Sequence, residues 1–127
     1  MTDTKTILVA VSDIFFYTKI RDAFLPSGYK LERLRKTEDW QEKALQSQPM
    51  GLIVNMNDDR LNAPEILKSL KTLPETQSIP ILAFANHEEV GTWKLAKDLG
   101  IQKIVSRNEF SARTLALFEE LTSSATS

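Results

Sequence analysis

The chain contains no cysteine, only four glycines and a single histidine. Without cysteine, neither a disulfide framework nor a thiolate metal site is available. Sixteen basic residues against seventeen acidic ones give a formal charge of −1, so the basic surplus typical of nucleic-acid binding is missing. No apolar run approaches the roughly 20 residues that span a bilayer, and no hydrophobic segment of a signal peptide follows Met1. We therefore expect a cytoplasmic protein that binds neither nucleic acid nor membrane.

Length and composition fit one compact domain. The chain has 127 residues, of which 42% are hydrophobic and 26% are charged, an ordinary balance for a globular domain. A chain of this size buries roughly 65 to 70% of its unfolded surface, which supports a core without disulfides or metals. We expect a single domain over 1–127, in which the small polar residues 122–127 form a frayed tail.

Five apolar segments predict strands. Runs of branched residues at 7–11, 51–54 and 79–85 are typical of strands buried on both faces of a parallel sheet. Alternating apolar and charged residues at 29–34 predict an edge strand, and 101–105 predicts a short last strand.

Five helices are predicted from apolar residues at helical spacing, four of them preceded by capping residues. The capping positions are Ser12 with Asp13, Thr37, Asn62 with Glu65, and Asn86 with Glu89. The inward stripes are Phe16, Ile20, Ala23 and Phe24; Trp40, Ala44 and Leu45; Ala63, Ile66, Leu67 and Leu70; Thr92, Leu95, Ala96 and Leu99; and Phe110, Leu117, Phe118 and Leu121.

The alternation of strands and helices predicts the fold. Right-handed crossovers between the strands give a parallel sheet covered on both faces. We expect an α/β fold, a flavodoxin-like (βα)5 three-layer sandwich whose five-stranded sheet has the order 2-1-3-4-5. Ligands of such sheets bind outside the carboxyl ends of the strands. Four loops would meet there, at 12–13, 55–59, 85–87 and 106–108.

Over essentially its whole length the chain resembles the receiver domain of two-component response regulators, the CheY-like family. The strongest local matches are 7–13, 49–57, and 79–82 followed by Leu99-Gly100 and the last strand. In that family, acidic residues after the first strand bind Mg²⁺, and an aspartate at the end of the third strand accepts a phosphoryl group. A serine or threonine ends the fourth strand, and a lysine ends the fifth. The resemblance implies signal transduction through carboxylate attack on phosphorus.

This chain departs from the family at the functional positions. The phosphoacceptor position falls on Asn55, or on Met56 with a one-residue shift, and neither side chain can attack phosphorus. The paired acids become Val11 and Ser12, or Ser12 and Asp13. With at most one carboxylate in this pair, we expect no Mg²⁺ cofactor.

The other family positions differ as well. The switch hydroxyl becomes Ala85, and the aromatic often found in the fifth strand becomes Ile104. The lysine position carries Arg107, followed by Asn108 in place of proline. Arginine keeps the positive charge, but its broad planar guanidinium is not an equivalent phosphate sensor. The resemblance therefore predicts a degenerate receiver domain.

Several polar residues near the predicted site allow two interpretations. Asp13 is either a remnant metal ligand or a helix cap, and Asn55 either mimics one state of the acceptor or satisfies the loop backbone. Asp58 and Asp59 either join a cation site or are solvated. Arg107 either forms a standing ion pair with Asp13 or Asp58, or faces solvent.

Aromatic residues outside the inward stripes are candidates for partner binding. Phe15 and Tyr17 exceed what the first helix needs for its core, and Trp93 is one position off the stripe of its helix. Such rings can anchor a protein interface, although packing over the rim of the core accounts for them equally simply. The single histidine, His87, has no nucleophile and orienting partner in a recognisable motif, which favours a surface loop position.

We therefore expect a non-enzymatic, phosphorylation-independent receiver that binds a protein partner in intracellular signal transduction. Association with a second copy of the chain stays open. One alternative is phosphorylation at a displaced aspartate, Asp58 or Asp59. Another is a small ligand in the cleft, although neither the dinucleotide-binding glycine motif nor a P-loop is present.

Overall fold

A computed structural model describes residues 5–58, 60–86 and 88–126 of the chain. Its five strands are β1 (Thr6–Ala10), β2 (Lys30–Arg33), β3 (Gly51–Asn55), β4 (Ile81–Ala85) and β5 (Lys103–Ser106). All neighbouring strands pair in parallel, in the order β2-β1-β3-β4-β5. The predicted sheet and its order are confirmed.

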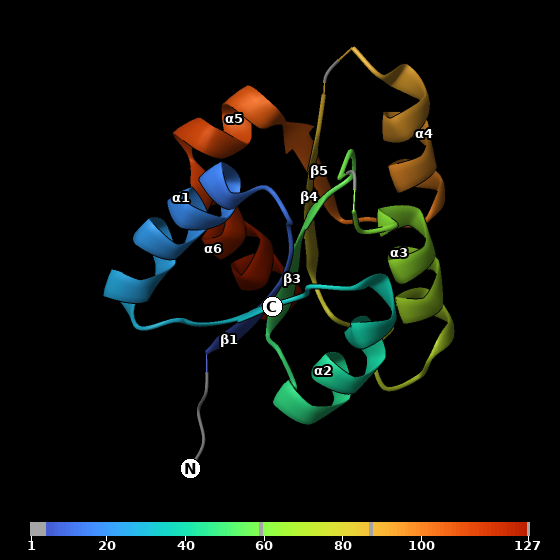
Figure 1. The fold of residues 1–127 in the computed structure, drawn as a ribbon, viewed down its shortest axis with the longest axis horizontal. Coiled ribbons are helices and arrows are strands. Elements are labelled where there is room, and N and C mark those ends of the chain that lie inside the picture. The colour runs from blue at the N-terminus through green and yellow to red at the C-terminus, as the bar shows by residue number, and fades with distance from the viewer. Residues whose placement is uncertain (1–4, 59, 87, 127) are drawn as a thin grey trace.

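Helices cover both faces of the sheet (Figure 1). On one face lie α1 (Ile14–Phe24), α5 (Arg107–Ala112) and α6 (Thr114–Thr126); on the other lie α2 (Trp40–Ser47), α3 (Ala63–Thr72) and α4 (Val90–Asp98). Two short 3-10 helices, η1 (Leu25–Ser27) and η2 (Thr37–Asp39), complete the three-layer sandwich. Within the described ranges, no helix combines the length and the apolar character needed to cross a membrane.

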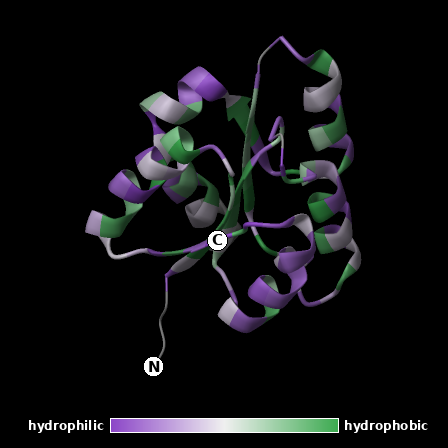
Figure 2. Ribbon diagram, in the orientation of Figure 1, coloured by the Kyte–Doolittle hydropathy of each residue, from purple (hydrophilic) through white to green (hydrophobic). Residues whose placement is uncertain are grey.

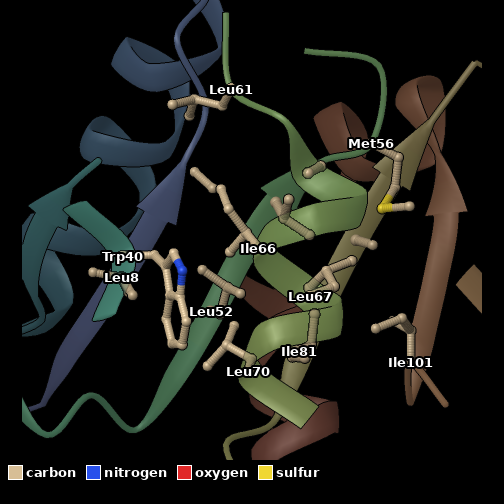
Figure 3. Close-up of a cluster of buried hydrophobic side chains, with 14 of the residues drawn as sticks. Leu8, Trp40, Leu52, Met56, Leu61, Ile66, Leu67, Leu70, Ile81 and Ile101 are labelled. Carbon is tan, nitrogen blue, oxygen red and sulfur yellow. The ribbon is translucent and has the colours of Figure 1, made fainter. Parts of the chain in front are cut away.

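Each face of the sheet carries its own hydrophobic cluster, and the strands are largely hydrophobic in Figure 2. Beneath α2 and α3, the indole of Trp40 packs among aliphatic side chains such as Leu52 and Leu70 (Figure 3). On the other face, the ring of Phe118 lies so near Gly51 that a Cβ there would come within 2.5 Å of two ring carbons. Glycine at the start of β3 therefore makes room for the aromatic core under α6.

The C-terminal helix differs from its prediction. It is divided at Arg113, whose φ of −133° and ψ of 36° interrupt the helix between α5 and α6. The division gives each part a separate packing partner: Phe110 of α5 stacks on Phe84 at 4.2 Å between ring centroids, and Phe118 of α6 packs edge-on to Phe24. Helix α6 also continues to Thr126, into the segment 122–127 for which we expected fraying.

Two other expectations about helices are wrong. The side chain of Asn86 accepts from the backbone N–H of Glu88, two residues on, so it forms a local turn and does not cap a helix. Helix α4 consequently begins only at Val90. Two residues of the predicted inward stripes are exposed: Leu95 in α4 and Leu45 in α2. These short helices bury a narrower face than the spacing of their apolar residues predicts.

Candidate functional site

The predicted loops meet at the carboxyl ends of the strands, around a cavity of about 650 Å³. Its lining comes from the loops after β1 and β3, the first turn of α1 and the start of α5. The lining residues are Ser12, Asp13, Ile14, Phe15, Asn55, Asn57, Asp58, Arg60 and Arg107. Ala85, at the switch position, is fully buried at the end of β4 and is not among them.

Asn55 is the last residue of the central strand β3 and is only 8% exposed. Its Oδ1 accepts the backbone N–H of Asn57 at 2.9 Å, which closes a local turn. Because this backbone donor fixes the orientation of the amide, the other end of the side chain is its Nδ2 group. Nδ2 has no hydrogen-bond partner within the described part of the chain. The position of the family's acceptor thus offers hydrogen-bond donors to the cavity.

Asp58 joins the loop after β3 to the loop after β1. Its Oδ2 accepts the backbone N–H of Ser12 at 2.7 Å, and its Oδ1 accepts the Ser12 hydroxyl at 2.8 Å. The same Oδ1 accepts the backbone N–H groups of Arg60 and Leu61. Partial burial acts to raise the pKa of Asp58, but these hydrogen bonds together lower it below its ordinary value. Asp58 is therefore a charged structural link with both oxygens occupied.

Asn57 joins the same loop to the loop after β4. Its Oδ1 accepts the backbone N–H of Asn86 at 2.7 Å, and its Nδ2 donates to the carboxylate of Glu89 at 2.8 Å. The indole Nε1 of Trp93 donates to the Asn86 carbonyl at 3.1 Å. Asn57 and Asp58 together hold three loops in place through the chain's own hydrogen bonds.

Asp13 and Arg107 do not meet. Asp13 caps α1, because its Oδ1 accepts the backbone N–H groups of Phe15 and Phe16. The guanidinium of Arg107 lies 4.8 Å from the ring centroid of Phe16, which itself stacks on Phe84. Among the described residues Arg107 forms no ion pair, so the pairing with Asp13 or Asp58 that we considered is not formed.

The aromatic candidates lie in different environments. Phe15 is 83% exposed at the rim of the cavity, whereas Trp93 is half-buried and holds the loop after β4. Tyr17 is also half-buried, with the Arg33 guanidinium 4.6 Å from its ring centroid. Two further candidates, Asp59 and His87, lie outside the described residues.

Sequence reasoning missed two members of this site. Asn57 falls inside the loop 55–59, in which we considered Asn55 and the two aspartates but not Asn57, yet it carries the bonds to the loop after β4. Arg33, at the end of the edge strand β2, donates from Nη2 to the Ser12 carbonyl at 2.9 Å. The only feature of the sequence that could have indicated Arg33 is its position at the carboxyl end of a predicted strand.

Comparison with known proteins bears on the fold. No protein-family model matches the chain, and no curated protein is significantly similar to it in sequence. Solved structures are similar to it over nearly its full length. A CheY-like response regulator receiver domain protein from Methanospirillum hungatei JF-1 superimposes with a TM-score of 0.83 at 11% identity, covering 98% of both chains. The fold is that of a receiver domain.

Two more receiver structures agree with this assignment. The signal receiver domain of a histidine kinase from Syntrophus aciditrophicus has a TM-score of 0.82 at 13% identity, covering 95% of this chain and 92% of the other. The chemotaxis response regulator CheY4 of Vibrio cholerae has a TM-score of 0.74 at 16% identity, covering 90% and 98%. At these identities the likeness concerns the fold alone.

The receiver fold implies a Mg²⁺ site, and the donors present here do not fit one. Mg²⁺ is usually held by one or two carboxylates with oxygens free to bind it, together with waters, in octahedral geometry. Here both oxygens of Asp58 accept protein hydrogen bonds, Asp13 caps a helix, and the strand end carries a neutral amide. In the part of the chain that is described, no group of three His, Cys, Asp or Glu residues is arranged to hold a metal.

Proposed function

We propose that this receiver fold acts as a phosphorylation-independent module that binds a protein partner in signal transduction. The observation that carries this proposal is the side chain at the end of β3. Asn55 has no carboxylate to attack phosphorus, and its amide oxygen is engaged by the backbone N–H of Asn57. Binding without turnover, and without Mg²⁺, is the function that this site supports best.

The links between the loops support the same proposal. The bonds of Asn57 and Asp58 join the loops after β1, β3 and β4 without a phosphoryl group or a metal. A surface that is held in one arrangement loses less conformational freedom when a partner binds. A cytoplasmic location and association with a second copy of the chain remain predictions.

A displaced acceptor is the main alternative, and the contacts of Asp58 weigh against it. Four protein donors bind its two oxygens, so an attack on phosphorus requires these bonds to break first. Asp59 is tested together with Asp58 in the experiment below. For the second alternative, a small ligand in the cleft, native mass spectrometry of the purified protein is the test.

Incubation with acetyl phosphate and Mg²⁺, followed by intact-mass measurement, tests the proposal. We expect the wild-type chain to keep its mass, while a receiver domain with an intact acceptor aspartate, treated in parallel, gains a phosphoryl group. A stoichiometric adduct on the wild type, labile to hydroxylamine as an acyl phosphate is, contradicts the proposal. If that adduct disappears in the Asp58→Ala, Asp59→Ala double variant, phosphorylation at a displaced aspartate is the correct function.

Trp93 is one of the partner-binding candidates from the sequence. Because its indole donates to the Asn86 carbonyl, Trp93→Ala would also release the loop after β4. Phe15→Ala is the cleaner test, since its ring is mostly exposed and the core does not depend on it.

A further inference from the structure

The cavity at the carboxyl edge has unused hydrogen-bond donors and an apolar rim. We propose that it binds a carboxylate side chain of the protein partner, Asp or Glu, while a neighbouring apolar side chain of the partner packs on Ile14 and Phe15. This inference rests on the proposed function and adds the chemistry of the partner to it.

Several hydrogen-bond donors at the cavity have no acceptor among the described residues. Both oxygens of Asp58 and the Oδ1 of Asp13 are occupied by protein N–H or O–H groups. By contrast, Arg60 and Arg107 make no side-chain hydrogen bond and no ion pair with any described residue. The Nδ2 group of Asn55 is likewise unpartnered there, in a side chain that is 92% buried, since its exposed fraction is 8%. One carboxylate oxygen at the cavity, the Oδ2 of Asp13, accepts no hydrogen bond from a described residue. The free donors of Arg60, Arg107 and Asn55 outnumber it, so the cavity can take an external acceptor.

The two guanidinium groups at the cavity also take no part in the ion pairs of the described residues. All the ion pairs found among the described residues use other cations: Arg21, Lys43, Lys94, Lys103 and Arg113. The two guanidiniums at this cavity are thus left for an external anion. Guanidinium N–H groups bind carboxylates through charge-assisted, often bidentate hydrogen bonds. An acidic partner is complementary to them.

The apolar rim decides between a free ion and a protein side chain. Ile14 and Phe15 are 56% and 83% exposed, and both line the cavity. The buried face of α1 is formed by other residues, including Ile20 and Phe24, so the core does not require the two exposed ones. A free anion leaves Ile14 and Phe15 exposed. A partner segment that has an apolar residue beside its acidic residue covers these two side chains and also binds the donors of the cavity.

Titration of the isotope-labelled full chain with a short blocked peptide, in which Glu residues flank a Phe-Leu pair, tests the inference by NMR. At low ionic strength, where screening is weak, we expect saturable shifts of the Asn55 side-chain amide and of the Nε resonances of Arg60 and Arg107. The matched peptide with Gln in place of each Glu should bind at least about tenfold more weakly, because it offers no charged acceptor.

Variants at exposed positions show whether these residues form the site. Arg60→Gln and Arg107→Gln should each weaken the binding of the acidic peptide by about tenfold. Phe15→Ala should weaken the binding of both peptides. Lys68→Gln, an exposed cation on α3 away from the cavity, should leave the affinity unchanged. Equal losses at Lys68 and the two arginines would show nonspecific attraction and overturn the inference.

Two further results would also overturn it. One is the absence of a saturable shift at Asn55 with the acidic peptide. The other is that acetate or inorganic phosphate reproduces the shifts and binds as tightly as the peptide, which indicates a site for a free anion. No phosphoryl donor is present in this experiment, so a negative result leaves the acetyl phosphate test of the proposed function standing.

Discussion

Asp58→Ala removes the link between the end of β3 and the start of α1. The variant loses four hydrogen bonds, from the N–H and hydroxyl of Ser12 and from the N–H groups of Arg60 and Leu61, all between 2.7 and 2.9 Å. A hydrogen bond to a charged group contributes about 1.5 to 3 kcal/mol. One of these bonds is exposed and three are partly buried, so water replaces only part of what the donors lose, and bonds to one group do not add. We therefore expect the free energy of unfolding to fall by about 2 to 3 kcal/mol.

Urea denaturation followed by far-UV circular dichroism measures this loss, provided that the slope m is the same in both proteins. Asp98→Ala is the matched control. Its carboxylate is exposed and forms a single ion pair, with Lys94 at 3.2 Å, so its removal should change stability by less than about 0.5 kcal/mol. If Asp58→Ala costs no more than Asp98→Ala, the link that we describe does not stabilise the fold.

The pH dependence gives a second test of the same link. The pKa of Asp58 is lowered in the folded protein, so its charge stabilises the fold above the unfolded-state value of about 3.9. This contribution is lost as the pH falls through the lower folded-state pKa. The stability difference between wild type and Asp58→Ala should therefore narrow below about pH 4. A difference that stays constant from neutral to acidic pH contradicts this account.

Two more variants and one titration probe other parts of the structure. Gly51→Ala places a Cβ against the Phe118 ring and should destabilise the fold by about 1 to 3 kcal/mol in the same urea assay. Asn57→Ala should speed hydrogen exchange at the backbone amide of Asn86, because the acceptor of that amide is removed. Burial and the nearby Glu119 raise the pKa of Tyr29, so its ultraviolet titration should lie above the ordinary tyrosine value of about 10.

Each of these predictions has its own control. Gly91→Ala adds a Cβ where no atom lies within 4 Å, so it should be neutral or slightly stabilising, and an equal loss at Gly51 and Gly91 would contradict the packing argument. Unchanged exchange at Asn86 in Asn57→Ala would show that the loops are held by other contacts. Subtraction of the Tyr29→Phe titration isolates Tyr29, and a midpoint at or below about 10 would be the contrary result.

The fold could be predicted from the sequence because its signals are local. Continuous branched segments marked β1, β3 and β4, and crossover handedness then limited the order of the strands. The cap at Asn62 was also predicted correctly, since its side chain accepts the N–H of Glu65, three residues away. The same spacing at Asn86 and Glu89 did not give a cap, because Asn86 forms a local turn, so such local patterns predict most but not all of the elements.

The site was less predictable because its bonds join residues far apart in the chain. Asp58 bonds to Ser12 across 46 positions, and Asn57 bonds to Asn86 across 29. The spacing of residues along the chain does not predict hydrogen bonds between positions this far apart. The pairing considered for Arg107 would also join distant residues, and the guanidinium instead lies 4.8 Å from the ring centroid of Phe16 on α1.

The central claim is that the chain's own hydrogen bonds, with an amide at the end of β3, hold the loops of this receiver fold and make it unresponsive to phosphoryl chemistry. The most direct measurement is the amide NMR spectrum with and without excess acetyl phosphate and Mg²⁺. We predict that the resonances of Asn57, Asp58 and Asn86 stay in place. Saturable shifts of these three resonances, spreading over the loops after β1, β3 and β4, would contradict the claim.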